Sequence, residues 1–172
     1  MADYEDLTRE QLIEALAAAN ARVEAMRIDP TYGVLTRVAL DAEPPQHGSI
    51  VFWDVDHMHD LNEQWGYEIV DARIRLVCQS IREREDCILV ARWYSGDELI
   101  YCCPAIDAAL AAERIVELFK AQGIGITAGV TEIGPDGWKA AVSVASGLVQ
   151  SAKRDGDRGR VHHAPDPTHA AG

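Results

Sequence analysis

The stretch SIVFWDVD, residues 49–56, decides the fold of this 172-residue chain. The run from Ser49 to Val55 is mostly apolar, which is typical of a strand that lies inside a sheet and is covered on both faces. Asp54 and Asp56 stand at its far end. We therefore expect a central strand that brings two carboxylates to one edge of a sheet.

Further helix and strand patterns follow this strand in alternation. Residues 68–84 predict a helix, because apolar side chains recur there at helical spacing. Residues 87–92 and 99–103 predict two strands of a hairpin around a polar tip. A helix over 106–121, a strand over 124–130 and a helix over 138–153 follow, with room for one more short strand. This βαββαβ order predicts an α+β fold, a ferredoxin-like palm whose antiparallel sheet carries helices on one face.

The N-terminal part predicts one helix over residues 7–28, which precedes the palm. Its apolar positions follow a 4-3-4-3 spacing, the a/d pattern of a coiled coil: Leu12, Leu16, Ala19, Val23 and Met26. So short a helix is not stable alone, so it either packs on its own domain or forms a parallel dimer stalk. The predicted organisation is a helix over 1–28, a turn-rich connection and catalytic domain over 29–161, and a disordered tail over 162–172.

Composition excludes several classes of protein. Hydrophobic residues make up 48% and the formal net charge is −12, so the chain is neither disordered nor suited to bind a nucleic-acid polymer. It has no apolar run long enough to span a membrane and its N-terminus lacks the apolar core of a signal peptide. The four cysteines show no CxxC spacing. We therefore expect reduced thiols, a cytoplasmic location and no membrane partner.

Two acidic segments come together in this topology. The hairpin should lie beside the first strand, so that Asp97 and Glu98 at its tip approach Asp54 and Asp56. Buried carboxylates are costly when they are unpaired, and Mg²⁺ binds carboxylates together with substrate phosphates. Two such ions would stabilise an in-line displacement at a triphosphate. The alternative is that both segments are solvated turns.

Five motifs in this order resemble the GGDEF family, the diguanylate cyclases. Residues 29–37 follow the family pattern D-x-L-T-G-L-x-N-R, and residues 54–71 follow D-I-D-x-F-K-x-I-N-D-x-x-G-H-x-x-G-D without a gap. The signature loop G-G-D-E-F appears as SGDEL over 95–99, V-T-x-S-x-G resembles 126–130, and A-D-x-A-L-Y-x-A-K-x-x-G-R resembles the stretch up to Gly156. The residues that the motifs keep are Asp29, Gly33, Arg37, Asp54, Asp56, Asn62, Gly66, Asp71, Ala145, Ala152, Lys153 and Gly156.

The resemblance implies a nucleotidyltransferase that condenses two nucleoside triphosphates, GTP above all, into a cyclic dinucleotide such as cyclic di-GMP and releases pyrophosphate. It implies two Mg²⁺ or Mn²⁺ ions per site, held by Asp54, Asp97 and the Val55 carbonyl. Glu98 would lie beside the ions and the attacking ribose 3′-hydroxyl, so that Asp97 and Glu98 are the catalytic residues. Because each site would hold one nucleotide, two chains must face each other as a homodimer through the N-terminal helix.

The resemblance also implies which residues bind the nucleobase and the phosphates. Asn62 and Asp71 would bind the nucleobase edge, since a carboxylate accepts from the N1–H and the 2-amino group of guanine. The backbone N–H groups of His57, Met58 and His59 would contact the phosphates, and Lys153 would pair with the terminal ones.

Departures from the family pattern leave two further hypotheses open. Ser95 replaces a glycine, His59 a lysine and Asp157 an arginine, and Tyr67 and Val70 make the wall near the base bulkier. A degenerate domain that holds nucleotide without turnover, as a regulatory module, is one alternative. A palm-type cyclase of a defence system that makes an adenine-containing product is the other. The inhibitory R-x-x-D site of the family is missing, because its two positions fall on Asp86 and Leu89.

Overall fold

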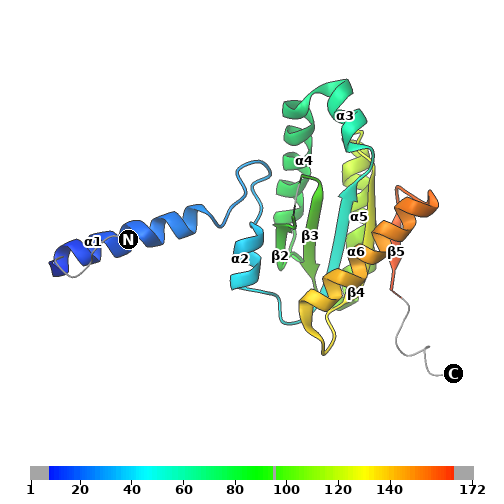
Figure 1. Cartoon of the computed structure of the whole chain (residues 1–172). Coiled ribbons are helices and arrows are strands. Elements are labelled where there is room, and N and C mark those ends of the chain that lie inside the picture. Colours follow the sequence, from blue (N-terminus) through cyan, green and yellow to red (C-terminus); the bar gives the residue numbers. More distant parts are fainter. Residues whose placement is uncertain (1–7, 95, 165–172) are drawn as a thin grey trace.

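A five-stranded sheet in the order β2-β3-β1-β4-β5 forms the centre of the molecule (Figure 1). The computed structural model describes residues 8–94 and 96–164, so Ser95 and the expected tail from residue 165 onward lie outside the described part. The strands are β1 (Ser49–Val55), β2 (Leu89–Arg92), β3 (Glu98–Cys103), β4 (Ile126–Glu132) and β5 (Val161–His163). All neighbouring pairs are antiparallel except β4 and β5, which are parallel. The predicted α+β palm is confirmed.

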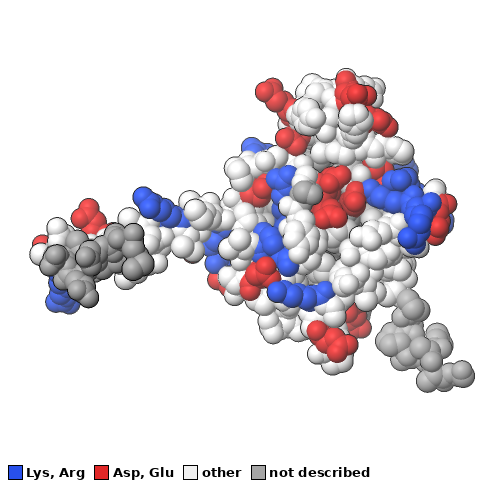
Figure 2. Space-filling model, in the orientation of Figure 1, with Lys and Arg blue, Asp and Glu red and all other residues white. Residues whose placement is uncertain are grey.

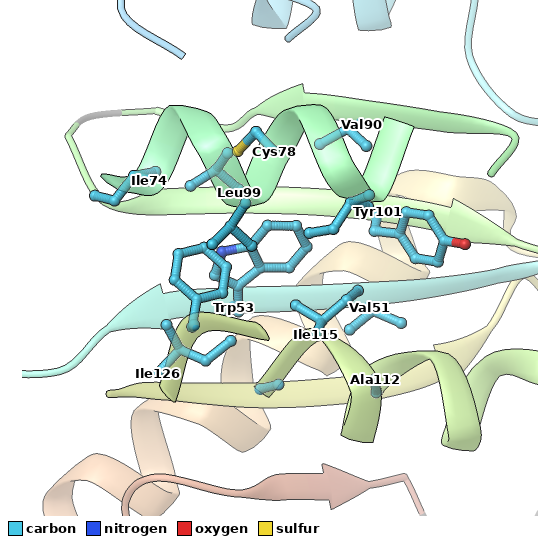
Figure 3. Packing of buried hydrophobic residues seen from close by; sticks show 14 of the residues in the cluster. Val51, Trp53, Ile74, Cys78, Val90, Leu99, Tyr101, Ala112, Ile115 and Ile126 are labelled. Atoms are coloured by element: carbon cyan, nitrogen blue, oxygen red, sulfur yellow. The ribbon is translucent and has the colours of Figure 1, made fainter. Parts of the chain in front are cut away.

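Helices cover both faces of the sheet, which corrects the expectation of helices on one face. Successive side chains of β1 point to opposite sides: Val51 and Trp53 pack in the cluster with α4 (Tyr67–Arg82) and α5 (Ala108–Ala121), whereas Phe52 packs in the cluster with α6 (Gly137–Asp155). Figure 3 shows the first cluster, in which the side chains of Trp53, Leu99 and Ile115 meet between β1, β3 and α5.

Two short helices lie where the sequence patterns indicated no helix, and a short 3-10 turn lies at the start of the predicted helix over 106–121. They are α2 (Arg37–Ala42), α3 (Met58–Trp65) and the 3-10 turn η1 (Ala105–Asp107). No residue of α3 is fully buried, and its apolar residues Met58, Leu61 and Trp65 pack only partly buried against the core. The chain turns at Asp56 and His57 and enters the helix at Met58.

Helix α1 (Arg9–Ala25) projects away from the sheet (Figure 1). A capping box begins it, because the Thr8 hydroxyl accepts from the Gln11 backbone N–H while the Gln11 side chain accepts from the Thr8 N–H. None of its residues is buried, and the side chains of Leu16 and Val23 are 62% and 59% exposed. The hypothesis that this helix packs on its own domain is wrong. Neither α1 nor any other helix in the described ranges is long and apolar enough to cross a membrane.

Helix α6 sits unusually close to strand β4. A β-carbon added at Gly129 would lie 2.2 Å from the backbone oxygen of Ala145, so only glycine permits this contact. The apolar side of α6 thereby packs tightly on the sheet, and its last turn, with Lys153, reaches the end of β1. Strand β5 then returns beside β4 and includes His162 and His163, which the sequence interpretation placed in the tail.

Candidate active site

The end of β1 and the start of β3 bring two of the predicted carboxylates together. Asp54 and Glu98 are direct partners in the antiparallel register of β1 and β3, so their side chains stand on the same face of the sheet. The backbone N–H of Val55 donates to the backbone oxygen of Asp97 at 3.4 Å, which holds the hairpin tip against the end of β1. The predicted approach of the two acidic segments is therefore observed.

The ammonium group of Lys153 lies among the groups predicted to hold metal. It donates to the Asp54 carboxylate and, at 2.8 Å, to the Val55 carbonyl, and it lies 3.3 Å from the Asp56 carboxylate. The side chain of Lys153 is only 16% exposed. In this arrangement Lys153 therefore neutralises the acidic cluster and pairs with the predicted metal ligands, whereas the resemblance implies that it pairs with the terminal phosphates.

Asp56 is a buried carboxylate beside the acidic cluster. Its carboxylate is 6% exposed and accepts a hydrogen bond from the Thr127 hydroxyl at 2.8 Å, and Arg158 lies 3.5 Å from it. The Thr127 oxygen in turn accepts from the Gly159 backbone N–H at 3.2 Å. This buried carboxylate links β1, β4 and the segment after α6, which is a positioning role.

Two carboxyl groups of the cluster, those of Asp54 and Glu98, have a raised pKa. Burial raises the pKa of the Asp54 carboxyl, Asp97 and Asp56 raise it further, and Lys153 opposes the rise. Burial also raises the pKa of Glu98, and the charges of Asp54 and Asp97 add to the effect. Both pKa values are raised mainly because the carboxyl groups are buried, and the neighbouring negative charges add to this effect.

The donor set fits a divalent cation, although it is not assembled around one. Among the described residues no three acidic, histidine or cysteine side chains converge closely enough to hold a metal ion. A carboxylate oxygen of Asp54 and the Val55 carbonyl nevertheless point at a single positive charge, the Lys153 ammonium. Hard oxygen donors of this kind are the ligands that Mg²⁺ prefers.

The two residues predicted to bind the base lie on neighbouring helices. Asn62 is on α3 and Asp71 on α4. The side-chain amide oxygen of Asn62 is buried and has no hydrogen-bond partner within the described chain, which leaves an acceptor unsatisfied at a cost that a ligand would remove. Asp71 lines a hollow of about 450 Å³ along α4, together with Thr31 and Arg75. No contact joins Asn62 directly to Asp71.

The start of α3 presents free backbone N–H groups. His57, in the left-handed conformation at φ 55°, begins the helix without a side-chain cap, so the N–H groups of its first turn have no intrahelical partner. The rings of His57 and His59 instead face Asp60 and Glu63 of the same helix at 3.5 and 3.4 Å. This arrangement is consistent with a backbone contact to phosphate, the role predicted for residues 57–59.

The turn after α1 touches the hairpin tip. The Asp29 carboxylate accepts from Arg92 at 2.8 Å, and Arg92 also donates to the Gly96 carbonyl at 3.1 Å. Gly96 directly precedes Asp97. The chain that follows the projecting helix is thus joined through one guanidinium to the loop that carries the acidic residues.

The face in Figure 2 shows how the charges gather. Acidic side chains near the centre of the domain adjoin basic ones to their right. The two arginines that follow Gly156 are both engaged, because Arg158 contacts Asp56 and Arg160 pairs with Asp157.

The sequence interpretation missed three residues of the site. No role was predicted for Thr127, Arg158 or Tyr32. In the structure Thr127 and Arg158 contact Asp56, and the Tyr32 hydroxyl donates to Asp71 at 3.2 Å. The motif register was the one available signal, since Thr127 and Tyr32 both stand inside family motifs. Their contacts join residues 71 and 39 positions apart, which no local spacing shows.

Comparison with known proteins identifies relatives at the level of family and fold. The family model described as "Diguanylate cyclase, GGDEF domain" matches residues 34–154. No curated protein matches the chain.

Several solved structures share the fold. One is a microbial GGDEF domain studied with bis-(3′,5′)-cyclic di-GMP, 16% identical, with a TM-score of 0.69 over 81% of this chain and 99% of that one. Another is the coiled coil and GGDEF domain of DgcB from Caulobacter crescentus in complex with c-di-GMP, 22% identical, with a TM-score of 0.63 over 89% and 99%. A third, LapD S helix-GGDEF-EAL from Vibrio cholerae, is 17% identical, with a TM-score of 0.67 over 90% of this chain and 41% of that one.

Proposed function

The chain belongs to the GGDEF family of diguanylate cyclase domains, and from this premise we propose that it condenses two GTP molecules into a cyclic dinucleotide such as cyclic di-GMP. In each half of the reaction the 3′-hydroxyl of one nucleotide attacks the α-phosphorus of the other. A new P–O bond forms, the hydroxyl proton is lost and pyrophosphate leaves.

The convergence of Asp54 and the Val55 carbonyl on one cation, opposite Glu98, carries this proposal. The same oxygens, with Asp97 from the hairpin tip, would hold two Mg²⁺ or Mn²⁺ ions. Such ions supply charge stabilisation for the attacking and leaving oxygens. Lys153 would then move from Asp54 to the terminal phosphates, to which a lysine offers a mobile point charge.

Glu98 is the group best placed to act on the attacking hydroxyl. Its raised pKa means that it takes up a proton more readily than an ordinary glutamate, which suits a general base that must accept the 3′-hydroxyl proton near neutral pH. Asn62 and Asp71 would bind the base, and the N–H groups at the start of α3 would contact the phosphates.

Two chains must meet for this chemistry, because each site holds one nucleotide. Helix α1 supports a parallel pairing, because its a/d side chains are exposed and none of them is buried in the described structure. Pairing through α1 raises the effective concentration of one catalytic domain at the other. We place the homodimer in the cytoplasm, where GTP is available and where four free thiols remain reduced.

A second candidate, nucleotide binding without turnover, is favoured by one observation. The arginine expected to contact the triphosphate is Asp157 here, and the neighbouring guanidinium groups of Arg158 and Arg160 are paired with Asp56 and Asp157. The site therefore offers less free positive charge to a triphosphate than the family pattern implies. Such a domain would act as a regulatory module.

Incubation with each of the four NTPs and Mg²⁺ or Mn²⁺, followed by mass analysis of the products, tests both candidates. We expect cyclic di-GMP from GTP, loss of product in Asp97→Asn and Glu98→Gln, and unchanged turnover in the control Glu117→Gln, which is exposed on α5. GTP binding without consumption would favour the regulatory module. An adenine-containing product would overturn the choice of GTP, and absence of any nucleotide binding would overturn both candidates.

A further inference from the structure

Tyr32 occupies an unusual place for a polar side chain. It belongs to the turn between α1 and α2, yet it is 1% exposed and packs in the cluster between the sheet and α4. Its hydroxyl donates to a carboxylate oxygen of Asp71 at 3.2 Å. Among the described residues it is the only side chain that donates a hydrogen bond to Asp71.

The turn that carries Tyr32 is held from several directions. One oxygen of Asp29 accepts from the backbone N–H groups of Thr31 and Tyr32 at 3.1 and 2.8 Å. Arg92, which is bonded to the other oxygen of Asp29, lies over the Tyr32 ring at 4.6 Å. From the helix side, Arg75 donates to the Thr31 carbonyl at 2.6 Å. These contacts therefore fix the backbone of the turn and the orientation of the Tyr32 ring.

A fixed phenol gives the Asp71 carboxylate a preferred orientation. An ionised carboxylate has two oxygens and about four acceptor sites, so one bond to Tyr32 leaves the group able to accept more. Without that bond the side chain on the surface of α4 would be free to rotate. Recognition of a base by two parallel hydrogen bonds requires both carboxylate oxygens to lie in one plane with the two donors.

We propose that Tyr32 is a positioning residue for base recognition, whose hydroxyl orients the Asp71 carboxylate toward a purine edge with two adjacent donors. Guanine has such an edge, formed by N1–H and the 2-amino group, whereas hypoxanthine keeps N1–H alone. This inference rests on the proposed function, because it takes Asp71 as the base-binding carboxylate. It adds a residue that discriminates between guanine and its one-donor analogue.

The test measures binding of 3′-deoxy-GTP and 3′-deoxy-ITP to the full chain, since neither nucleotide has the attacking hydroxyl and neither can be cyclised. The variant Tyr32→Phe keeps the ring and removes the donor. Tyr101→Phe is the matched control: Tyr101 is equally buried and its hydroxyl donates to Asp86 at 2.7 Å. Both variants lose one hydroxyl–carboxylate bond, and only one of them faces Asp71.

We expect Tyr32→Phe to raise the Kd of 3′-deoxy-GTP by about three- to tenfold, the range that one hydrogen bond supplies, and to affect 3′-deoxy-ITP less. Tyr101→Phe should change neither Kd. In an Asp71→Ser background Tyr32→Phe should have no further effect, because the two residues act through one contact.

Two outcomes would overturn the inference alone, and a third would overturn it together with the proposed function. An unchanged ratio of the two Kd values in Tyr32→Phe would do so, and so would a loss that persists in the Asp71→Ser background. Both results are measured by nucleotide binding and do not require that the wild type makes product. A wild type that binds GTP without turnover would therefore contradict the cyclase activity and leave this inference testable. A wild type that binds neither nucleotide would overturn the inference together with the proposed function.

Discussion

Replacing Lys153 by methionine removes the ammonium that Asp54, Asp56 and the Val55 carbonyl share, and it keeps most of the apolar stem. Without this positive charge the carboxylates at the end of β1 repel one another with little compensation. The variant therefore asks whether the acidic cluster is a cation site that the lysine fills. We expect a loss of stability that a divalent metal reverses.

The size of the loss follows from burial. Removing one partner of a buried ion pair costs about 3–5 kcal/mol. Here the side chains of Lys153 and Asp54 are 16% and 24% exposed, so water screens part of the effect, and Arg158 stays 3.5 Å from Asp56. We expect the free energy of unfolding to fall by about 2–3 kcal/mol.

Denaturant unfolding with and without Mg²⁺ measures this loss. A metal present at about 100 times its Kd adds about 2.7 kcal/mol of stability, so saturating Mg²⁺ should restore most of what Lys153→Met loses. Lys139→Met is the matched control on the same helix. Its ion pair with Asp41 is 2.9 Å long but the lysine is 64% exposed, so we expect a loss below about 1 kcal/mol and no rescue by metal.

The loss should also depend on pH in a defined direction. The pKa of the Asp54 carboxyl is already raised by burial in the folded chain, and removal of Lys153 raises it further. The folded state therefore binds this proton more tightly than the unfolded state, so the loss is smallest at low pH and grows as pH rises through the folded-state pKa. A loss that Mg²⁺ leaves unchanged, or one no larger than that of Lys139→Met, would refute the reasoning.

Three further predictions concern the catalytic carboxylate, the projecting helix and product inhibition. Because burial raises the pKa of Glu98, its charge destabilises the folded chain above that pKa. Glu98→Gln should therefore raise the Tm at neutral pH without metal, and this gain should vanish at low pH. A lower Tm of the variant in thermal scans across pH would contradict this. Leu16→Glu together with Val23→Glu should yield a monomer by sedimentation, with low specific activity at low concentration. The Tm of the domain should not change, since no residue of α1 is buried. A wild type that is already monomeric would exclude the dimer stalk. Cyclic di-GMP should not inhibit tightly and non-competitively, because Asp86, which is held by Arg84 at 2.8 Å, stands where the family pattern has an arginine; strong inhibition at saturating GTP would show that a different product site exists.

Elements with a strong burial pattern could be predicted from the sequence. Strand β1 has the predicted bounds of Ser49 and Val55, because a short apolar run covered on both faces leaves little choice. Helix α3 and its one-residue connection to α4 at Gly66 were not predicted, because α3 is short and its apolar side chains are only partly buried. Periodicity shows that residues 138–153 have an apolar side, but it does not say which face of the sheet that side covers.

The candidate site divides in the same way. The approach of Glu98 to Asp54 follows from the hairpin topology, because partners in a register are set by strand pairing. The position of Lys153 depends on how closely α6 packs at Gly129, which is a matter of tertiary contact. Whether α1 packs on the domain also depends on tertiary contact, since the apolar a/d residues have the same spacing in an exposed helix and in a buried one.

The turn at Asp29 makes the projecting helix a lever. Helix α1 has 17 residues and no buried side chain, so it is a stiff arm about 25 Å long whose base is held by short-range contacts at the turn. A rotation of about 5° at that base displaces the far end by about 2 Å over this length. In the other direction, a small sideways pull at the tip becomes a torque at Asp29, and the guanidinium of Arg92 passes it to Gly96, the residue before Asp97. A rotation of the helix would therefore act on the hairpin tip through the hydrogen bonds of Arg92.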